Sequence, residues 1–468
     1  MLIAGTLELA SKVRYGITSR GVPIFRFIPY DKRFLPMAVG CSQRNLSHNI
    51  HAIVEPGPLT QSLQLQKANL VQNLGQPTDA TELQVLLTTY AYDSRKELKT
   101  LPKITESVKF IESREFLEGK TFHIDPPGCR DVDDSFTIAK GIEGWNIAIN
   151  IADVAERVQE GDATDTAAKQ RATSFYTTEG TPVFQMLPQE IEEVATLLPG
   201  STKLTVSLCF KFANNSITDI CWKLTQTQTT TSYTYDQADV DICDELQVLR
   251  RIAATLGYDT PDSHIWVERL MIFYNTHAGI LLAKNGVGIL RRHKGPLSEN
   301  CPNCEDIPDI PEIPEFYESA EYCLPGSDTR HYGLKTDFYA YASSPLRRYA
   351  DLVNQRSIKS ILKGASPAKQ EQCVIDELNR RQKQAKAFSR DLFFMTTLSS
   401  MKNTSVQGIV LEEKKVWVPI WKRLIKIKSF VDSIPRGAKV NIQWHEAREH
   451  ARWKERIVFK VSKYSTLE

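Results

Sequence analysis

The sequence lacks any long hydrophobic run. No apolar stretch approaches the roughly 20 residues that a membrane-spanning helix needs. The N-terminus also lacks a charged segment followed by an apolar one, so we expect no secretory signal. A strong charge of one sign is missing as well, because the net charge of the 468 residues is only +2. We therefore expect a soluble protein with no membrane partner, and the charge balance neither requires nor excludes nucleic acid.

The cysteines do not suggest a disulfide framework. There are nine, an odd number, scattered over a long chain, which indicates free thiols and a reducing, cytoplasmic location. Cys301 and Cys304 form a C-x-x-C pair in a proline-rich acidic segment. Only Cys323 and His331 lie near enough in the sequence to complete a zinc site, so we favour free loop thiols there over zinc.

The charges are unevenly distributed along the chain. Residues 1–50 contain seven Lys and Arg residues against two acids, and the last 68 residues are also rich in Lys and Arg. The acids are concentrated between these basic ends. Such a distribution suits a polyanion that is guided towards a metal centre.

Four carboxylates are crowded into one short stretch of this acidic middle. Asp125, Asp131, Asp133 and Asp134 lie within ten residues, with only Arg130 as a local counter-charge. Like charges this close repel one another and raise one another's pKa. A hard divalent cation with oxygen ligands, above all Mg²⁺, would neutralise them. The alternative is an acidic surface loop that binds structural calcium, although the EF-hand spacing is absent.

The residues around the acids predict how they are brought together. Residues 120–124 and 135–138 are typical of short strands, and Pro126-Pro127-Gly128 predicts a tight turn between them. This turn would fold Asp125 back towards Asp131. If residues 131–133 are extended, Asp131 and Asp133 share a face, whereas Asp134 needs a bend to join them.

A second informative stretch runs from Ser343 to Tyr349. Ser344 is a suitable helix cap and Pro345 suits a first helical turn. Arg347 and Arg348 would then lie in that first turn, where they oppose the helix dipole. An arriving phosphate would remove the conflict. The alternative is a salt bridge to Asp351 or to another acid.

Both ends of the chain are predicted to be small β-barrels. Residues 1–55 alternate short β-type runs with turns, and from residue 404 onward five short strands with a turn at Gly437 suit an OB-type barrel. Both ends contain Lys and Arg residues together with aromatic residues. Binding of single-stranded nucleic acid requires such a mixture. For residues 1–55, a basic exterior around an aromatic core is the alternative. The residues concerned are Lys12, Arg14, Tyr15, Phe25, Arg26 and Phe27, and Lys414, Lys415, Trp417, Trp421, Lys422, Arg423, Lys426 and Lys428.

Taken together, these motifs resemble the RNB family of ribonuclease II, ribonuclease R and the catalytic subunit of the exosome. The four aspartates match its D-x5-D-x-D-D motif, and residues 331–351 match its H-F-G-L … T-S-P-I-R-R-Y-x-D block without a gap. Tyr176 before Met186-Leu187-Pro188, and Tyr235-Asp236-Gln237, match further segments. The resemblance implies an α+β fold. A mixed α/β RNB catalytic domain (113–400) would be flanked by an OB-like barrel with a connector (1–112) and a C-terminal OB-like barrel (401–468).

The resemblance also implies a processive 3′→5′ exoribonuclease. It would hydrolyse single-stranded RNA to nucleoside 5′-monophosphates as a monomer, with two Mg²⁺ ions about 4 Å apart. Asp125, Asp131 and Asp134 would position the metals, with Asp133 holding the second. Arg347 would stabilise the charge of the transition state. RNA contacts would come from Tyr176, Tyr235 and Arg348.

Two positions depart from the family pattern. Asn150 replaces a histidine before Ile151-Ala152-Asp153-Val154, and Ser389 replaces the glutamate of an E-R-D segment. Ser389 keeps open a second hypothesis, an RNA-binding adaptor of the same fold with weak or lost catalysis. A nuclease that also accepts DNA is a third, because contacts to the 2′-hydroxyl are not visible in a sequence.

Overall fold

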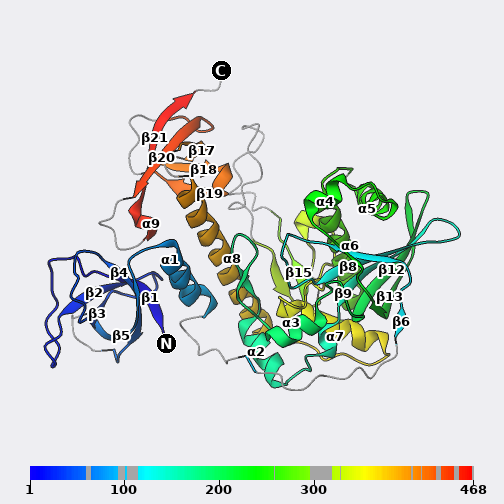
Figure 1. Ribbon diagram of the computed structural model, residues 1–468, viewed down its shortest axis with the longest axis horizontal. Coiled ribbons are helices and arrows are strands. Elements are labelled where there is room, and N and C mark those ends of the chain that lie inside the picture. The colour runs from blue at the N-terminus through cyan, green and yellow to red at the C-terminus, as the bar shows by residue number, and fades with distance from the viewer. Residues whose placement is uncertain are drawn as a thin grey trace. The chain divides into compact units, whose positions relative to one another are not determined.

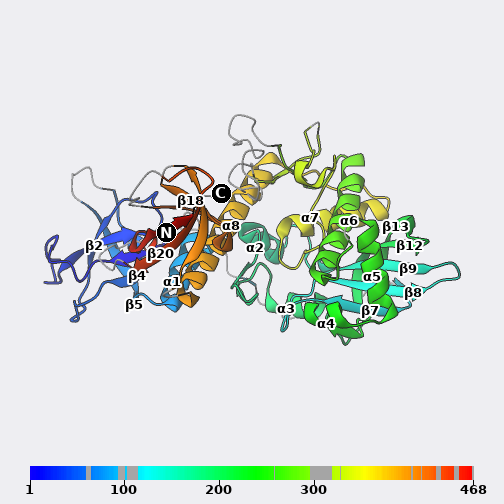
Figure 2. The same cartoon turned by 90° about the horizontal axis from the view of Figure 1, so that it is seen from above.

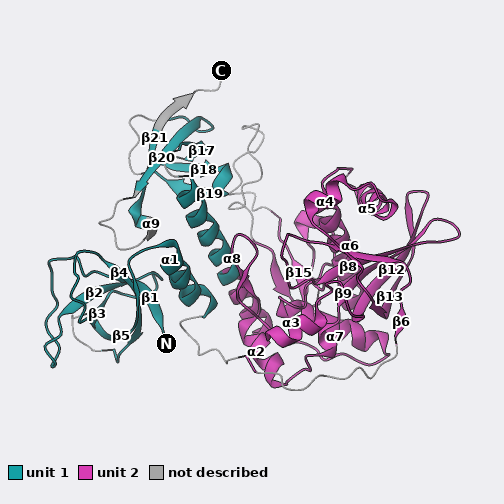
Figure 3. Ribbon diagram, viewed as in Figure 1, with its two compact units in different colours: residues 1–98, 384–468 teal, residues 99–383 magenta. Residues whose placement is uncertain are grey.

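The computed structural model divides into two compact units, which are described separately (Figure 3). The first contains Met1–Leu98 and Gln384–Glu468, and the second contains Lys99–Lys383. The structure describes residues 1–59, 65–92, 101–102, 114–257, 259–295, 319–326, 328–401, 404–412, 414–427, 434–446 and 453–465. Cys301 and Cys304 lie outside these residues. The three domain ranges expected from the sequence stay a prediction.

The N-terminal strands close into the predicted barrel, in the order β1-β2-β3-β5-β4. The strands are β1 (Ile3–Leu7), β2 (Ile24–Pro29), β3 (Met37–Gly40), β4 (Ile50–Pro56) and β5 (Gln66–Gly75). Phe25 and Phe27 are fully buried in the barrel core, so the expectation that they stack on RNA is wrong and the aromatic-core alternative holds for them. Tyr15 is exposed, and the Arg14 guanidinium lies 4.5 Å from the centre of the Phe25 ring.

The C-terminal strands hydrogen-bond in the order β19-β18-β17-β20-β21. They are β17 (Val406–Glu412), β18 (Lys415–Val418), β19 (Arg423–Lys426), β20 (Lys439–Glu446) and β21 (Ile457–Ser465). This is the strand order of the N-terminal barrel opened between its third and fifth strands, which is the OB topology expected from the sequence. Trp417 and Trp421 are buried, so they too belong to a core rather than to a stacking surface.

One buried carboxylate links three parts of the first unit. Asp391 lies on α8 (Gln372–Ser400) and has no exposed surface. Its Oδ2 accepts hydrogen bonds from the hydroxyls of Tyr30 and Tyr90, both at 2.9 Å. Its Oδ1 lies 3.2 Å from a guanidinium nitrogen of Arg423. Because a buried charge is stable only when it is paired and hydrogen-bonded, Asp391 fixes α8 to the end of β2, to the π-helical turn Leu87–Ala91 after α1 (Asp79–Leu86), and to β19.

The second unit is built on a seven-stranded sheet in the order β14-β7-β8-β9-β12-β13-β6 (Figure 2). These strands are Thr231–Tyr233, Lys120–Ile124, Asp134–Lys140, Trp145–Ala152, Lys203–Ala213, Ser216–Thr227 and Glu115–Phe116, in that order. Alternate residues of the central strands, such as Phe136 and Ile149, form an apolar face. This face packs against α5 (Asp244–Thr255) and α6 (Ser263–Lys284). The neighbouring α4 (Tyr235–Val240) is in contact with α6.

The opposite face of the sheet carries buried hydroxyl groups. Thr121 Oγ1 on β7 lies 3.1 Å from Thr227 Oγ1 on β13, although three strands separate them in the sheet order. The sheet therefore curls so that β7 approaches the end of β13. Asn150, which replaces the family's histidine, lies inside this curl. It donates to Thr137 and accepts from Ser207, both at 2.8 Å, so its role here is to satisfy a buried polar network.

Other elements of the second unit are the 3₁₀ turn Val154–Glu156, α2 (Ala163–Arg171), β10 (Phe175–Tyr176), β11 (Pro182–Phe184), α3 (Gln189–Ala195), β15 (Leu290–Arg292), β16 (Glu321–Cys323) and α7 (Tyr349–Leu362) (Figure 1). The 3₁₀ turn, α2, α3, β16 and α7 contribute residues to a second core. Val132, Leu346 and Leu352 meet in this core, which brings the acidic loop next to the start of α7. Within the described part of the chain, no helix is both long and apolar enough to cross a bilayer.

A close approach inside the second unit leads to a stability prediction. A Cβ atom on Gly279 of α6 would lie 2.7 Å from the backbone nitrogen of Tyr339. We expect Gly279→Ala to lower the free energy of unfolding by about 1–3 kcal/mol, despite the better helix propensity of Ala. Urea unfolding measures this, with Lys284→Ala on the same helix as the control. Unchanged stability of Gly279→Ala would show that the helix can shift at no cost.

Candidate active site

The four aspartates all lie where β7 ends and β8 begins. Asp125 directly follows β7, and Asp134 is the first residue of β8, paired with Ile151 of β9. A turn closed by the hydrogen bond from Cys129 N to Pro126 O separates them, as predicted. Gly128 in this turn has a φ of 79°, a value that favours glycine. The adjacent strands therefore hold all four acids at one end of the sheet.

Asp133 forms the link to the Arg347 segment. Its side chain is buried, and its Oδ2 accepts from Arg347 Nε at 3.1 Å. Its Oδ1 accepts from the backbone N–H of Leu346 at 2.9 Å. Burial raises the pKa of Asp133 to about 7, while Arg347 and the Leu346 N–H act in the opposite direction. Arg347 itself keeps 43% of its side chain exposed, so it can also meet a substrate.

Asp134 lies in the same electrostatic environment without such a direct partner in the described contacts. Burial raises its pKa well above the ordinary value, and the charges of Asp125 and Asp133 raise it further. Mutual repulsion of this kind is the expected signature of carboxylates that share a site for a cation.

His123 was missed by the sequence analysis. Its Nδ1 lies 2.8 Å from Oδ2 of Asp125, and its Nε2 lies 2.7 Å from the hydroxyl of Ser232 on β14. A carboxylate only accepts hydrogen bonds, so Nδ1 carries a proton. Residues two apart on a strand share a face, and this spacing could have placed His123 beside Asp125.

We expect His123→Ala to weaken Mg²⁺ binding without destroying the fold. His123 fixes the orientation of Asp125, and loss of such a supporting hydrogen bond typically costs 10- to 100-fold in metal affinity. The Mg²⁺ concentration for half-maximal RNA hydrolysis should rise by about that factor. The exposed His48, replaced by Ala, is the control. An unchanged Mg²⁺ titration would mean that Asp125 is oriented without His123.

Two further residues approach Asp131. The hydroxyl of Tyr176 on β10 donates to Asp131 Oδ2, so this predicted RNA-stacking residue also touches the acid cluster. Glu192 on α3 was not recognised from the sequence, where it belongs to a run of acids with the pattern of a surface helix. Burial raises its pKa to about 8, with Asp131 as the next contribution, and Gln185 donates to its Oε2 at 2.6 Å.

The helix predicted at Ser344 begins later than expected. Residues 345–347 form a turn, and α7 starts at Tyr349 with Arg348 as its N-cap in an extended conformation. The N–H of Ser344 is bound by Asp351 at 2.8 Å, and that of Leu346 is bound by Asp133. These side chains satisfy the backbone of the turn, so a helical continuation is not needed there.

Arg348 adopts the predicted alternative of a salt bridge to Asp351. Its guanidinium donates to Asp351 Oδ1 at 2.8 Å and lies 4.0 Å from the centre of the Tyr341 ring. Arg347 pairs with Asp133 and also donates to Ser344 Oγ at 3.0 Å. The two arginines therefore face different acids.

The donor set suits a hard divalent cation, but the side chains are turned to protein partners. The cluster offers carboxylate oxygens, the ligands that Mg²⁺ prefers. Among the described residues, however, no three His, Cys, Asp or Glu side chains converge as a metal site. Asp125 faces His123, Asp131 faces Tyr176 and Asp133 faces Arg347. A cation would therefore have to draw some of these carboxylates away from their present partners.

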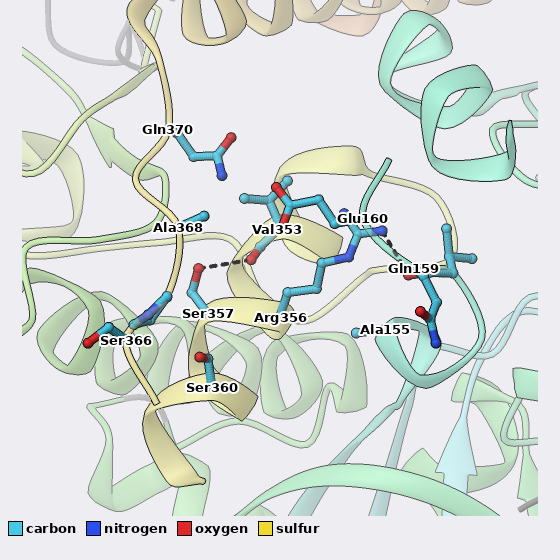
Figure 4. Close-up of a pocket in the computed structure, with 12 residues that line it drawn as sticks. Ala155, Gln159, Glu160, Val353, Arg356, Ser357, Ser360, Ser366, Ala368 and Gln370 are labelled. Carbon is cyan, nitrogen blue, oxygen red and sulfur yellow. Dashed lines mark hydrogen bonds between the residues drawn. The ribbon is translucent and has the colours of Figure 1, made fainter. Parts of the chain in front are cut away.

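The hollow drawn in Figure 4 is separate from the acid cluster. This cavity of about 400 Å³ is lined by residues that follow β9, by α7 and by the segment before α8, and no aspartate of the cluster contributes to it. Arg356 points across it but is already bound to Asp165 and to the carbonyl of Val158, both at 2.8 Å. Its lining thus has no free cationic group for an anionic substrate.

The chain belongs to the RNB family. The model described as the RNB domain matches residues 113–256 and 244–364, which together make up more than half of the chain. The four aspartates, Tyr176, Tyr235 and Arg347 all lie inside the matched range. Exoribonucleases of this family generally depend on divalent metals.

The chain is similar in sequence to proteins named exoribonuclease or exonuclease. The chain is 26% identical over 333 residues to exoribonuclease 2 of Aeromonas hydrophila, with 55% of this chain and 49% of that protein covered. It is 23% identical over 449 residues to the human exosome complex exonuclease RRP44, with 77% and 46% covered. The chain thus spans about half of the length of these relatives or less.

Solved structures confirm the fold. RNase R of Mycoplasma genitalium superposes with a TM-score of 0.74 at 16% identity, covering 98% of this chain and 89% of that chain. Yeast Ssd1, a pseudonuclease, superposes with a TM-score of 0.68 at 17% identity, covering 91% and 65%. The α+β architecture with an RNB-type centre and OB barrels at both ends is therefore established, and it occurs both in a nuclease and in a protein named a pseudonuclease.

Proposed function

We propose that this protein is a processive 3′→5′ exoribonuclease that hydrolyses single-stranded RNA to nucleoside 5′-monophosphates. The contact that carries the proposal joins Arg347 to Asp133, 214 positions apart in the chain. It brings a partly exposed guanidinium into a cluster of four carboxylates. This arrangement of carboxylates beside a guanidinium suits a phosphodiester substrate. A cation held by the carboxylates can bind the phosphate, and the guanidinium can bind the same phosphate.

In this proposal, each residue of the site has its own role. Asp125, Asp131, Asp133 and Asp134 would hold Mg²⁺, which supplies an activated water and stabilises the leaving oxygen when bound. Arg347 uses its Nε for Asp133 and one terminal nitrogen for Ser344, which leaves its other terminal nitrogen for a phosphate oxygen. Tyr176, which donates a hydrogen bond to Asp131, would meet the terminal nucleotide. Arg348 contributes through its pairing with Asp351, which holds the turn that carries Arg347.

The test uses 5′-labelled RNA, the same sequence as DNA, and an RNA duplex, each with Mg²⁺ and with EDTA. A ladder that shortens from the 3′ end on single-stranded RNA, only with Mg²⁺, supports the proposal. Asp133→Asn should abolish the ladder, whereas Asp219→Asn, a change at an acid that is 64% exposed, should not. Light scattering of the purified protein tests the expected monomer. Equal digestion of DNA would replace the proposal with a less selective nuclease.

A second candidate is an RNA-binding adaptor without catalysis. Ser389 stands where the resembled motif has glutamate and is exposed on α8, and the fold is shared with a pseudonuclease. This candidate predicts tight binding of single-stranded RNA with no products at any Mg²⁺ concentration. Ser389→Glu would then be expected to create or raise activity if the missing carboxylate is the cause.

A further inference from the structure

Two aromatic side chains form a stacked pair next to the acid cluster. The rings of Tyr235 and His264 have centroids 3.6 Å apart and planes that differ by only 10°. The N–H of Asp125 donates to the carbonyl of Tyr233, two residues before Tyr235, at 3.1 Å, so the tyrosine lies near the acids. Burial raises the pKa of the Tyr235 hydroxyl, and the charges of Asp125 and Asp134 raise it further. No motif in the sequence analysis included His264.

Local hydrogen bonds hold both rings in place. Tyr235 is the first residue of α4, and its carbonyl accepts from Ser263 Oγ at 3.1 Å, while the N–H of Ser263 donates to Asp239 Oδ1 at 2.7 Å. These bonds fix the start of α6 to α4. Asp262 Oδ1 then binds both the backbone N–H of His264, at 2.9 Å, and the ring Nδ1, at 3.1 Å. An exposed histidine without such partners would sample several rotamers.

The two rings differ in their exposure to solvent. Tyr235 is partly buried and packs against the apolar core between the sheet and α6. His264 covers one face of the tyrosine, and 61% of its own side chain is exposed. The outer layer of the pair is therefore the imidazole and not the phenol.

We propose that His264 provides the face on which an RNA base stacks, with Tyr235 as the layer that supports it from behind. This proposal rests on the proposed function and changes the role expected for Tyr235 from direct contact to support. Histidine is one of the side chains on which unpaired RNA bases stack. Because the imidazole is already fixed on one face and one edge, little side-chain entropy is lost when a base arrives.

The experiment compares His264→Leu with His264→Phe. Leucine removes the aromatic face while keeping an apolar side chain, and phenylalanine keeps the face. Binding is measured in EDTA by fluorescence anisotropy of 5′-labelled single-stranded RNA, and stacking by the quenching of 2-aminopurine placed at successive positions from the 3′ end. We expect His264→Leu to weaken binding roughly 5- to 100-fold and to abolish quenching at one position. His264→Phe should restore both, and Val240→Ala, at an exposed site on α4, should change neither.

Kinetics in Mg²⁺ separate this proposal from the proposed function. His264→Leu should raise KM for RNA with a much smaller change in kcat, because His264 touches the substrate and not the reacting phosphate. Degradation by the wild type together with unchanged binding and quenching in His264→Leu would overturn the role of His264 alone. Tighter binding in His264→Leu would also overturn it, since the base would then use the tyrosine face that His264 covers. A wild type that neither binds nor degrades RNA would overturn both proposals.

Discussion

Arg347→Ala is expected to reduce kcat for RNA hydrolysis by about 100- to 1,000-fold, with a smaller change in KM. Among the residues that the structure describes, its guanidinium is the positive group in direct contact with Asp133, while 43% of the side chain remains exposed. Without this guanidinium, the negative charge that develops on the phosphate during attack loses a hydrogen-bond donor. Single-turnover cleavage of labelled RNA at saturating Mg²⁺ measures this effect on the chemical step.

The same substitution also affects stability, and a double variant separates the two effects. Without Arg347 the pKa of the buried Asp133 should rise further from about 7, so the carboxyl takes up a proton near neutral pH. Arg347→Ala/Asp133→Asn should then be at least as stable as Arg347→Ala but equally inactive. Arg347→Lys should stay strongly impaired, because lysine cannot bind Asp133 and a phosphate through a planar fork. Wild-type rates in Arg347→Ala would contradict the proposed mechanism.

Asp134→Asn is expected to raise the melting temperature of the metal-free protein while removing its response to Mg²⁺. Burial and the charges of Asp125 and Asp133 hold the pKa of Asp134 well above its ordinary value in the folded state. The ionised form therefore opposes folding, and an uncharged amide relieves this. In the wild type, Mg²⁺ should raise the melting temperature because it binds the folded state, and this gain should be small in Asp134→Asn.

The raised pKa values also predict how the stability of the metal-free protein changes with pH. A carboxyl whose folded pKa is raised binds more protons folded than unfolded, so stability falls as the pH rises from the unfolded value to the folded one. For Asp133 this window runs from 3.8 to about 7, and the shift corresponds to roughly 4 kcal/mol. Thermal melts in EDTA between pH 4 and pH 8 should show this decline in the wild type and a shallower one in Asp134→Asn. Asp219→Asn serves as the control, and a lower melting temperature for Asp134→Asn at pH 8 would contradict the argument.

The sequence sufficed for the features that depend on local pattern. The strands around the aspartates follow from short runs of β-branched and aromatic residues, and the turn between them follows from Pro126, Pro127 and Gly128. The five C-terminal strands follow from short β-type runs between turn residues. Each of these patterns is local to a few residues, so it does not depend on contacts with distant parts of the chain.

Features set by distant parts of the chain were not predictable in the same way. The start of α7 moved because Asp133 and Asp351 bind the backbone of the preceding turn, and capping rules see only neighbours in the sequence. Glu192 has the pattern of a surface acid, and only the fold covers part of it and brings it near Asp131. The aromatic residues of the barrels, Phe25 and Trp421 among them, have the composition of a stacking surface but form cores, since composition does not tell which face of a strand is covered.

The attachment of Asp391 has a consequence for the order of synthesis. Tyr30 and Tyr90 leave the ribosome long before the residue that binds their hydroxyls, since 361 and 301 positions separate them from Asp391. Domains generally fold as they emerge, starting from the N-terminus. The first barrel can therefore form before the residues of the second unit are translated, and the hydrogen bonds of these two tyrosine hydroxyls to Asp391 form only after α8 is made.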